Sequence, residues 1–255
     1  MTEYTIRYHT GDKVLLEYDH AAHSYVVDEL KIPNVTTLID GVFPKYLTEW
    51  AARCGADYWK ERYAEHEALV VNTSDMYHGI IHAHKEVSGA ARDIGHETHY
   101  WIEEYINSAI KNPNEVDWKL GALSDKAKNA VQAFLKWEAS HDIVWIGSEK
   151  KVYSKEYDYA GTIDAIAMIN DKYCIVDFKT SAKIYKEAYV QLSAYAQAVE
   201  EIHGRPVDLA VVLRLDKEED KYQEAAFIPS DYFHVFLMAM QMKKFQSTRI
   251  KKEKL

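Results

Sequence analysis

The stretch YAGTIDAIAMINDKYCIVDFKTS, residues 159–181, decides the fold of this chain. Residues 159–169 and 172–179 are two runs of mostly apolar side chains, and the Asn170-Asp171 sequence between them is typical of a tight turn. The pattern predicts two antiparallel strands joined by that turn. Residues 143–154 have the same period of two and predict a third strand directly before the hairpin.

Three charged residues in this hairpin carry its chemistry. Asp177 and Lys179 are two residues apart on one strand, so their side chains share a face. Asp164 on the neighbouring strand converges on them if it lies on the matching face. Two carboxylates beside a lysine predict a site for a hard divalent cation with an adjacent general base or cation. A single Asp-x-Lys is more often a solvated strand end, but the second acid, the preceding Gly161 and the apolar strand favour the catalytic interpretation.

Helices and further strands surround the hairpin. The Ser-Asp pair at residues 124–125 predicts a helix start, and helical periodicity returns over residues 185–203 and beyond residue 230. Runs rich in β-branched or aromatic residues at 207–215 and 222–228 predict two more strands. The order of helix, three strands, helix, strands and helix predicts a mixed α/β core of about 150 residues.

The segment in front of this core has a β-rich part and a helical part. Residues 14–18 and 24–28 predict a hairpin or a meander, and residues 33–39 predict a turn that leads into a helix. From residue 46 to residue 110 the period becomes helical, although residues 66–90 are also compatible with a loop between helices.

Two further helix sequences flank the strands. DIGHETHYWIEEYI at residues 93–106 is similar to a Gly-x-x-x-His-x-x-Ile-Glu-x-Tyr helix, and QLSAY at residues 191–195 matches a Gln-x-x-x-Tyr helix. Together with GTID and IVDFKTS, they make the chain resemble the PD-(D/E)XK nuclease superfamily, in its RecB-type branch. HSYVVD at 23–28 and PNVTTLI at 33–39 resemble the N-termini of phage-encoded RecB-like nucleases. The resemblance extends to members of the mitochondrial genome maintenance exonuclease type.

The resemblance implies a restriction-endonuclease-like core, with a central mixed sheet flanked by helices in an α/β (mixed α+β) fold. An N-terminal β-hairpin and a helical elaboration are expected in front of that core. Residues 1–92 are accordingly expected to form N-terminal strands plus a helical cap or arch packed on the core. Residues 93–255 are expected to form the nuclease core with a basic C-terminal helix and tail.

The resemblance also implies roles for individual residues. His99, Asp164, Asp177 and the backbone carbonyl of Phe178 are expected to bind metal. Lys179 is expected to orient or deprotonate the attacking water. Glu149 corresponds to an acid that often begins this core, and it joins Lys179, Asp164 and Asp177 as an expected catalytic residue. Glu103 and Gly161 are expected to lie next to the metal ligands and to support them. The residues expected to bind substrate are Gln191, Tyr195, Thr180 and Ser181.

Such a site implies a Mg²⁺- or Mn²⁺-dependent deoxyribonuclease that uses one or two ions to hydrolyse phosphodiester bonds. Exonuclease action on DNA ends or single strands, in recombination, repair or phage DNA metabolism, is favoured over endonuclease action. The alternative is a catalytically silent nuclease-fold module that binds nucleic acid or a recombination partner, but the intact Asp-Asp-Lys set argues against it.

The composition excludes some other cofactors. Two cysteines are too few for an iron–sulfur cluster, and the sequence has no Gly-x-x-x-x-Gly-Lys-Ser/Thr motif for an ATP site. The expected partner is DNA. A recombinase, single-strand-binding protein or helicase would be a separate chain.

The charge of the chain is uneven. The 255 residues include 31 basic and 40 acidic side chains, which give a formal net charge of −9. Residues 1–110 carry 9 basic and 18 acidic groups, whereas the remainder carries 22 of each. The acidity therefore does not exclude a DNA substrate, but it predicts weak, salt-sensitive and metal-assisted binding. Residues 241–255 hold six cations against one acid, and they are either a solvated helix end or a DNA-contacting arm.

No apolar run approaches the roughly 18–20 residues that cross a bilayer, and the N-terminus has no secretory signal. A cytoplasmic location in a bacterial or phage-infected cell, with no membrane partner, is therefore expected. His78, His82 and His84 are more typical of a solvated helix face than of a zinc site. A group of aromatic residues either stacks on unpaired bases or fills a seam between the helical segment and the core. Its members are Tyr46, Trp50, Tyr58, Trp59 and Tyr63.

Overall fold

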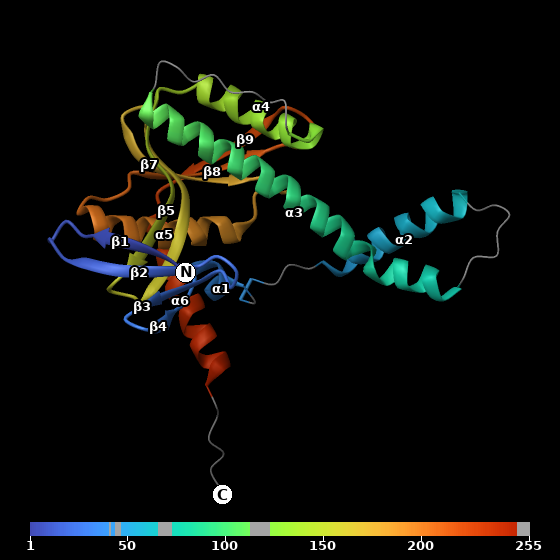
Figure 1. Cartoon of the computed structure of the whole chain (residues 1–255), viewed down its shortest axis with the longest axis horizontal. Helices are drawn as coiled ribbons and strands as arrows, with labels where there is room; N and C mark the ends of the chain where they lie inside the picture. Colours follow the sequence, from blue (N-terminus) through green and yellow to red (C-terminus); the bar gives the residue numbers. More distant parts are fainter. Residues whose placement is uncertain (41, 44–46, 66–72, 113–122, 249–255) are drawn as a thin grey trace, which may run out of the picture. The chain divides into compact units, whose positions relative to one another are not determined.

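The computed structural model describes residues 1–40, 42–43, 47–65, 73–112 and 123–248 (Figure 1). The side chains of residues 63–65 and of Thr73 are not part of this description. The predictions for Tyr46, for the Tyr63 ring and for the basic tail beyond residue 248 therefore concern groups outside the described residues.

The elements confirm the predicted mixed α/β fold class. The described strands are β1 (Thr2–Arg7), β2 (Lys13–Asp19), β3 (Ser24–Val27), β4 (Leu30–Ile32), β5 (Ile143–Ser154), β6 (Tyr159–Ile169), β7 (Lys172–Lys179), β8 (Leu209–Leu215) and β9 (Tyr222–Phe227). The described helices are α1 (Val35–Ile39), α2 (Thr48–Glu65), α3 (Thr73–Lys111), α4 (Asp125–Ala139), α5 (Lys186–His203) and α6 (Ser230–Ser247).

The central sheet has the strand order β5-β6-β7-β8-β9. β5, β6 and β7 are antiparallel neighbours, as the hairpin sequence predicts. β7 and β8 run parallel, because α5 carries the chain back between them, and β9 pairs with β8 in the antiparallel direction. Asn170 and Asp171 have φ angles of 48° and 63°, the conformation that a type I′ turn requires. This mixed sheet is consistent with the restriction-endonuclease-like fold.

Helices cover both faces of the central sheet (Figure 1). One apolar cluster joins α4 and the C-terminal part of α3 to one face, and Ile102, Phe134 and Val176 are fully buried in it. A second cluster joins α5, α6 and the N-terminal strands to the other face and includes Ile175 and Leu192. Neighbouring residues of β7 thus point into opposite clusters. Because both of its faces are buried, β7 is held rigidly in the sheet, together with Asp177 and Lys179 at its end.

The N-terminal strands form a second, antiparallel sheet in the order β1-β2-β3-β4. This sheet is attached to the β5–β6 hairpin by hydrogen bonds. The Tyr8 hydroxyl donates to the Tyr153 carbonyl oxygen at 2.6 Å, and the Ala160 N–H donates to the Pro33 carbonyl oxygen at 2.9 Å. The predicted hairpin is therefore part of a larger sheet that packs on the core.

The chain divides into two compact units. Met1–Phe43 and Thr98–Leu255 form one unit, and Pro44–Glu97 forms the other. This grouping places the N-terminal strands with the core, whereas the division expected from the sequence separates residues 1–92 from residues 93–255. Among the described helices, none is both long and apolar enough to cross a membrane.

The helical unit consists of α2 and the N-terminal part of α3. α3 begins at Thr73, so most of the segment considered as a loop is helical. A Cβ atom at Gly79 would lie 2.2 Å from the Tyr58 ring, so the two helices pack closely there. Trp50 and Tyr58 line a cavity of about 370 Å³ within this unit, and Trp50 contacts His84 edge-on. These contacts favour a packing role for both aromatic residues.

Candidate active site

Glu149 and Asp164 occupy facing positions on β5 and β6. The register of the residues on either side leaves the two acids opposite each other. Glu149 has a φ of 50°, a left-handed conformation that few residues other than glycine adopt. The surrounding sheet maintains this strained conformation, and such strain is often found at functional positions.

His99 on α3 completes a group of three side chains that can bind a metal ion. One ligand atom each of His99, Glu149 and Asp164 lies within 4.8 Å of the other two. His99 Nδ1 is 3.5 Å from Asp164 Oδ2, and its ring packs edge-on against Phe178 with the centroids 6.1 Å apart. Ile102, one turn further along the helix, is buried against the sheet and orients this face of α3. One imidazole and two carboxylates fit a divalent cation that is bound mainly through oxygen, as Mg²⁺ and Mn²⁺ are.

The electrostatic environment favours a cation at this group. Burial, followed by the Asp177 carboxylate, raises the pKa of Asp164 to about 7. Burial and the Asp164 carboxylate likewise raise the pKa of Glu149. Burial and the Lys179 ammonium lower the pKa of His99, so that its imidazole is neutral and able to act as a ligand. A divalent cation would offset the negative charge that makes ionisation of the two acids unfavourable.

Asp177 and Lys179 lie on the same face of β7, as strand alternation predicts. Lys179 Nζ donates to Asp177 Oδ1 at 2.8 Å and lies 2.6 Å from Oδ2. Burial lowers the pKa of Lys179, but the Asp177 and Asp164 carboxylates outweigh burial, and the pKa is raised overall. Lys179 is therefore an ammonium ion here. It is suited to orient a water or to neutralise a phosphate oxygen rather than to take a proton from water.

The expected metal ligands are neighbours, but they do not all belong to the three-residue group. The Asp177 carboxylate is 3% exposed and is paired with Lys179. Phe178 takes part through its N–H, which donates to Asp164 Oδ2 at 2.8 Å. Metal binding by Asp177 and by the Phe178 carbonyl stays a prediction. Glu149, expected as a catalytic acid but not as a metal ligand, lies among the side chains that can bind a metal.

Gln191 and Tyr195 lie one turn apart on α5, beside β6. The Gln191 side-chain amide donates to the Tyr195 hydroxyl at 3.1 Å. A Cβ atom at Gly161 would lie 2.3 Å from the Tyr195 ring, so glycine is needed for this close approach. Tyr195 is 3% exposed, and it interacts electrostatically with the Asp164 and Asp177 carboxylates. Contact of these two side chains with substrate stays a prediction.

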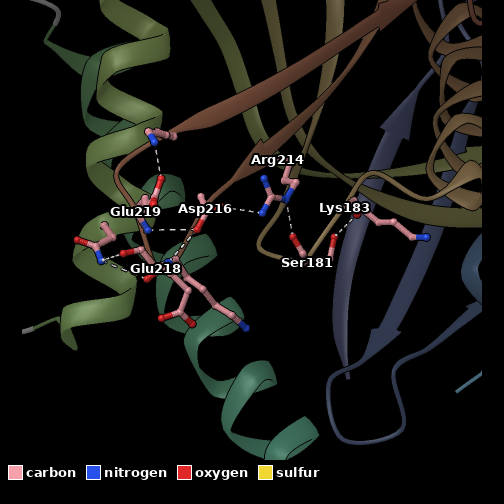
Figure 2. Close-up of polar contacts among 9 residues, drawn as sticks. Ser181, Lys183, Arg214, Asp216, Glu218 and Glu219 are labelled. Carbon is pink, nitrogen blue, oxygen red and sulfur yellow. Dashed lines mark hydrogen bonds and ion pairs between the residues drawn. The ribbon is translucent and has the colours of Figure 1, made fainter. Parts of the chain in front are cut away.

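Arg214 on β8 anchors the segment that follows Lys179, as Figure 2 shows. Its Nε donates to the Ser181 carbonyl oxygen at 2.8 Å, and its Nη2 donates to Asp216 at 2.7 Å. The sequence patterns do not single out Arg214. Its position opposite Lys179 appears only once β7 and β8 are paired.

The remaining expected residues lie around this group. The Ser181 hydroxyl donates to the Lys183 carbonyl oxygen at 2.8 Å and thus shapes its own loop (Figure 2). Thr180 is half-buried at the end of β7. Glu103 lines the same cavity as Glu149, and burial raises its pKa. The binding and supporting roles expected of Thr180, Ser181 and Glu103 stay predictions.

Lys151 is a second cation near the acids that the sequence patterns do not single out. Its side chain is 10% exposed, and its Nζ lies 3.6 Å from Glu149 Oε2. The two residues are separated by one position on β5 and share a face of the strand. Lys151 is close to the candidate metal centre only because Glu149 belongs to that centre, and the sequence alone does not show this.

A mixed sheet that carries acids and a lysine beside a group of metal-binding side chains is typical of metal-dependent nucleases. The model of the PD-(D/E)XK nuclease superfamily matches residues 49–250, and the chain belongs to this superfamily. One similar solved structure, titled "Crystal structure of SSO0001", shares 15% sequence identity with this chain. The similarity covers 79% of this chain and 89% of that chain, with a TM-score of 0.26. None of the curated proteins compared with the chain matches it.

Proposed function

We propose that the protein is a Mg²⁺- or Mn²⁺-dependent deoxyribonuclease that hydrolyses phosphodiester bonds. The observation that carries this proposal is the convergence of His99, Glu149 and Asp164 within 4.8 Å of one another, beside the Asp177–Lys179 ion pair. Membership of the nuclease superfamily supports it. Keeping several acids and a lysine together in a partly buried place costs stability, which favours a catalytic role over a purely binding one.

The side chains have distinct tasks in this proposal. His99, Glu149 and Asp164 would hold the cation, which when bound supplies Lewis acidity and lowers the pKa of a bound water. The Phe178 N–H holds the Asp164 carboxylate in place, and Asp177 holds the Lys179 ammonium. Lys179 then orients the attacking water or stabilises the negative charge that develops on the phosphate oxygens.

The RecB-type branch and an exonuclease activity are the finer part of the proposal. Their support is the helix sequence at residues 93–106, which carries His99, and the Gln191–Tyr195 pair on α5. On this resemblance we propose action on DNA ends or single strands in recombination, repair or phage DNA metabolism. DNA is the proposed partner, in the cytoplasm, with any recombinase, single-strand-binding protein or helicase as a separate chain.

Cleavage of end-labelled DNA tests the proposal. Single- and double-stranded oligonucleotides with a 5′ or a 3′ label are incubated with Mg²⁺, with Mn²⁺ or with EDTA. We expect cleavage with either metal and none in EDTA, and stepwise shortening from one end if the enzyme is an exonuclease.

The Lys179→Met variant separates chemistry from metal binding. It removes the ammonium but keeps most of the side chain, so we expect cleavage to be lost and Mn²⁺ binding in calorimetry to remain. Lys172→Met, an exposed position on the same strand, is the matched control and is expected to cleave normally. Cleavage that persists both in EDTA and in Lys179→Met would overturn the proposal.

A further inference from the structure

A groove of about 1030 Å³ lies between the N-terminal sheet and β5. Glu103 and Glu149 line it, so the groove reaches one of the three side chains of the candidate metal centre. Its lining also includes Tyr4, Tyr18 and Lys151. β1 and β5 are the edge strands of their sheets, and residues of both strands line the groove together with residues of α5.

Lys151 places a positive charge inside this groove. Its Nζ lies 5.1 Å from the centroid of the Tyr18 ring and 5.8 Å from that of the Tyr4 ring. The ammonium also lies 3.6 Å from Glu149 Oε2, and the Glu103 and Asp164 carboxylates interact with it electrostatically. The two rings and the Glu149 carboxylate hold the ammonium in place. An ammonium has three N–H donors, so Lys151 retains the capacity to bind an anionic oxygen in the groove.

Tyr4 and Tyr18 lie on the same face of the N-terminal sheet. The strand register places Tyr4 opposite Leu16, two residues before Tyr18. The Tyr18 ring continues an aromatic row, because its centroid lies 4.9 Å from that of Tyr25 and 4.9 Å from that of His20. Tyr25 is buried behind this row, so the groove itself presents the Tyr4, Tyr18 and His20 rings together with the Lys151 ammonium.

This combination fits a single strand of nucleic acid better than a duplex. The bases of a single strand are open to stacking on aromatic side chains, whereas those of a duplex are covered by their neighbours. Among the described residues that line the groove, acidic and basic side chains are equal in number. These residues are Glu3, Glu103 and Glu149, and Arg7, Lys150 and Lys151. The net charge of the groove therefore does not by itself attract a polyanion, and stacking on the aromatic rings has to contribute to binding.

We propose that the groove binds a single-stranded segment of the DNA substrate, with a phosphate at Lys151 and bases against Tyr4 and Tyr18. This inference rests on the proposed nuclease function for the reaction itself, but strand binding can be measured without cleavage. In this arrangement Tyr4, Tyr18 and Lys151 bind single strands in preference to duplexes and position the bound strand next to Glu149.

Fluorescence anisotropy in EDTA measures the binding of a labelled oligothymidylate and of a duplex of the same length. We expect Tyr4→Leu and Lys151→Met each to weaken binding of the oligothymidylate by about tenfold. We expect duplex binding to change by less than about twofold. Thermal melting of each variant checks that it is folded. Tyr4→Leu changes a half-buried side chain on an edge strand, so this variant still tests the inference if Lys151→Met does not fold.

Two matched controls lie outside the groove. Lys155 resembles Lys151, because its Nζ lies 4.7 Å from the centroid of the Tyr8 ring and pairs with Asp12. Tyr222 is an exposed tyrosine on β9. We expect Lys155→Met and Tyr222→Leu to bind the oligothymidylate as the unmodified protein does.

Unchanged oligothymidylate binding in both groove variants, or an equal loss for single strands and duplexes, would overturn the inference. So would an unmodified protein that does not bind the oligothymidylate at all, the result expected if the strand edges take up a peptide instead. Failure of the proposed function gives a different pattern. A protein that cleaves no DNA would still lose single-strand binding selectively in the groove variants.

Discussion

Glu149 and Asp164 face each other across β5 and β6, and the Glu149 backbone has a left-handed φ of 50° at this point. The strands are paired in register on both sides of the two acids, so the sheet maintains this conformation. The carboxylates are therefore held near His99 before any cation is bound. Such preorganisation is what a metal site requires of its protein ligands.

This arrangement predicts that loss of either acid weakens metal binding. We expect Asp164→Asn and Glu149→Gln each to lower the affinity for Mn²⁺ by at least about tenfold, because each removes a charged ligand. Calorimetric titration with Mn²⁺ measures the effect. Asp171→Asn, in the turn of the same hairpin, is the control and is expected to bind Mn²⁺ normally. Normal affinity in both site variants would contradict the assignment of the metal site.

The raised pKa of Asp164 predicts how the stability of the metal-free protein depends on pH. Folding raises this pKa from 3.8 to about 7, so the folded protein holds the proton more tightly than the unfolded chain. The resulting stabilisation is complete below about pH 4 and is lost as the pH rises through about 7. In EDTA, the unmodified protein should therefore lose Tm relative to Asp164→Asn between about pH 5 and about pH 8.

Thermal melting of the two proteins in parallel checks this expectation. Groups whose pKa is lowered in the folded protein, such as Asp12 and Asp216, affect both proteins equally and cancel in the difference. Saturating Mn²⁺ should restore the Tm of the unmodified protein at the higher pH, because the cation binds the ionised carboxylate. A difference in Tm that is constant over the whole range would refute the raised pKa.

The contact between Gly161 and Tyr195 predicts a loss of stability when a side chain is added. The Cβ atom of Gly161→Ala would lie 2.3 Å from the Tyr195 ring, which is itself buried. We expect a loss of about 1–3 kcal/mol in the free energy of unfolding, measured with urea. Gly89→Ala is the control. It meets no atom within 4 Å and should stabilise its helix by about 0.5–1 kcal/mol.

Much of this site follows from the local sequence. The hairpin over residues 159–179 is predictable, because its apolar strands and its Asn170-Asp171 turn agree with each other. The ion pair between Asp177 and Lys179 follows from alternation along one strand, which depends on the local backbone alone. The same holds for Gln191 and Tyr195, one helical turn apart on α5.

Other features depend on contacts between distant segments or on unusual backbone angles. The left-handed φ of Glu149 has no local signal, because glutamate rarely adopts it. Lys151 lies beside Tyr4 and Tyr18 only because the N-terminal sheet packs on β5. The early start of α3 is hidden by a stretch that is rich in histidine and contains glycines, which weaken the helical pattern without preventing a helix.

Arg214 shows how such a distant contact can be tested. It joins β8 to the segment after Lys179 through the Ser181 carbonyl oxygen and pairs with Asp216 (Figure 2). Arg214→Met keeps the aliphatic stem but removes the guanidinium from both partners. Asp216 still accepts from the Glu218 and Glu219 N–H groups, but it loses its cation. We expect the substitution to cost about 1–3 kcal/mol of folding free energy, because a half-buried carboxylate loses a charged donor.

The effect on function distinguishes positioning from metal binding. Arg214 is not among the side chains that can bind the cation, so we expect Mn²⁺ affinity to be unchanged in Arg214→Met while DNA cleavage falls. Amide hydrogen exchange in residues 180–183 should become faster, since the segment loses its anchor. Arg205→Met, whose guanidinium is 3.9 Å from Asp208 and half-exposed, is the control and should leave cleavage and exchange unchanged. Equal exchange in the two variants would show that Arg214 does not hold this segment.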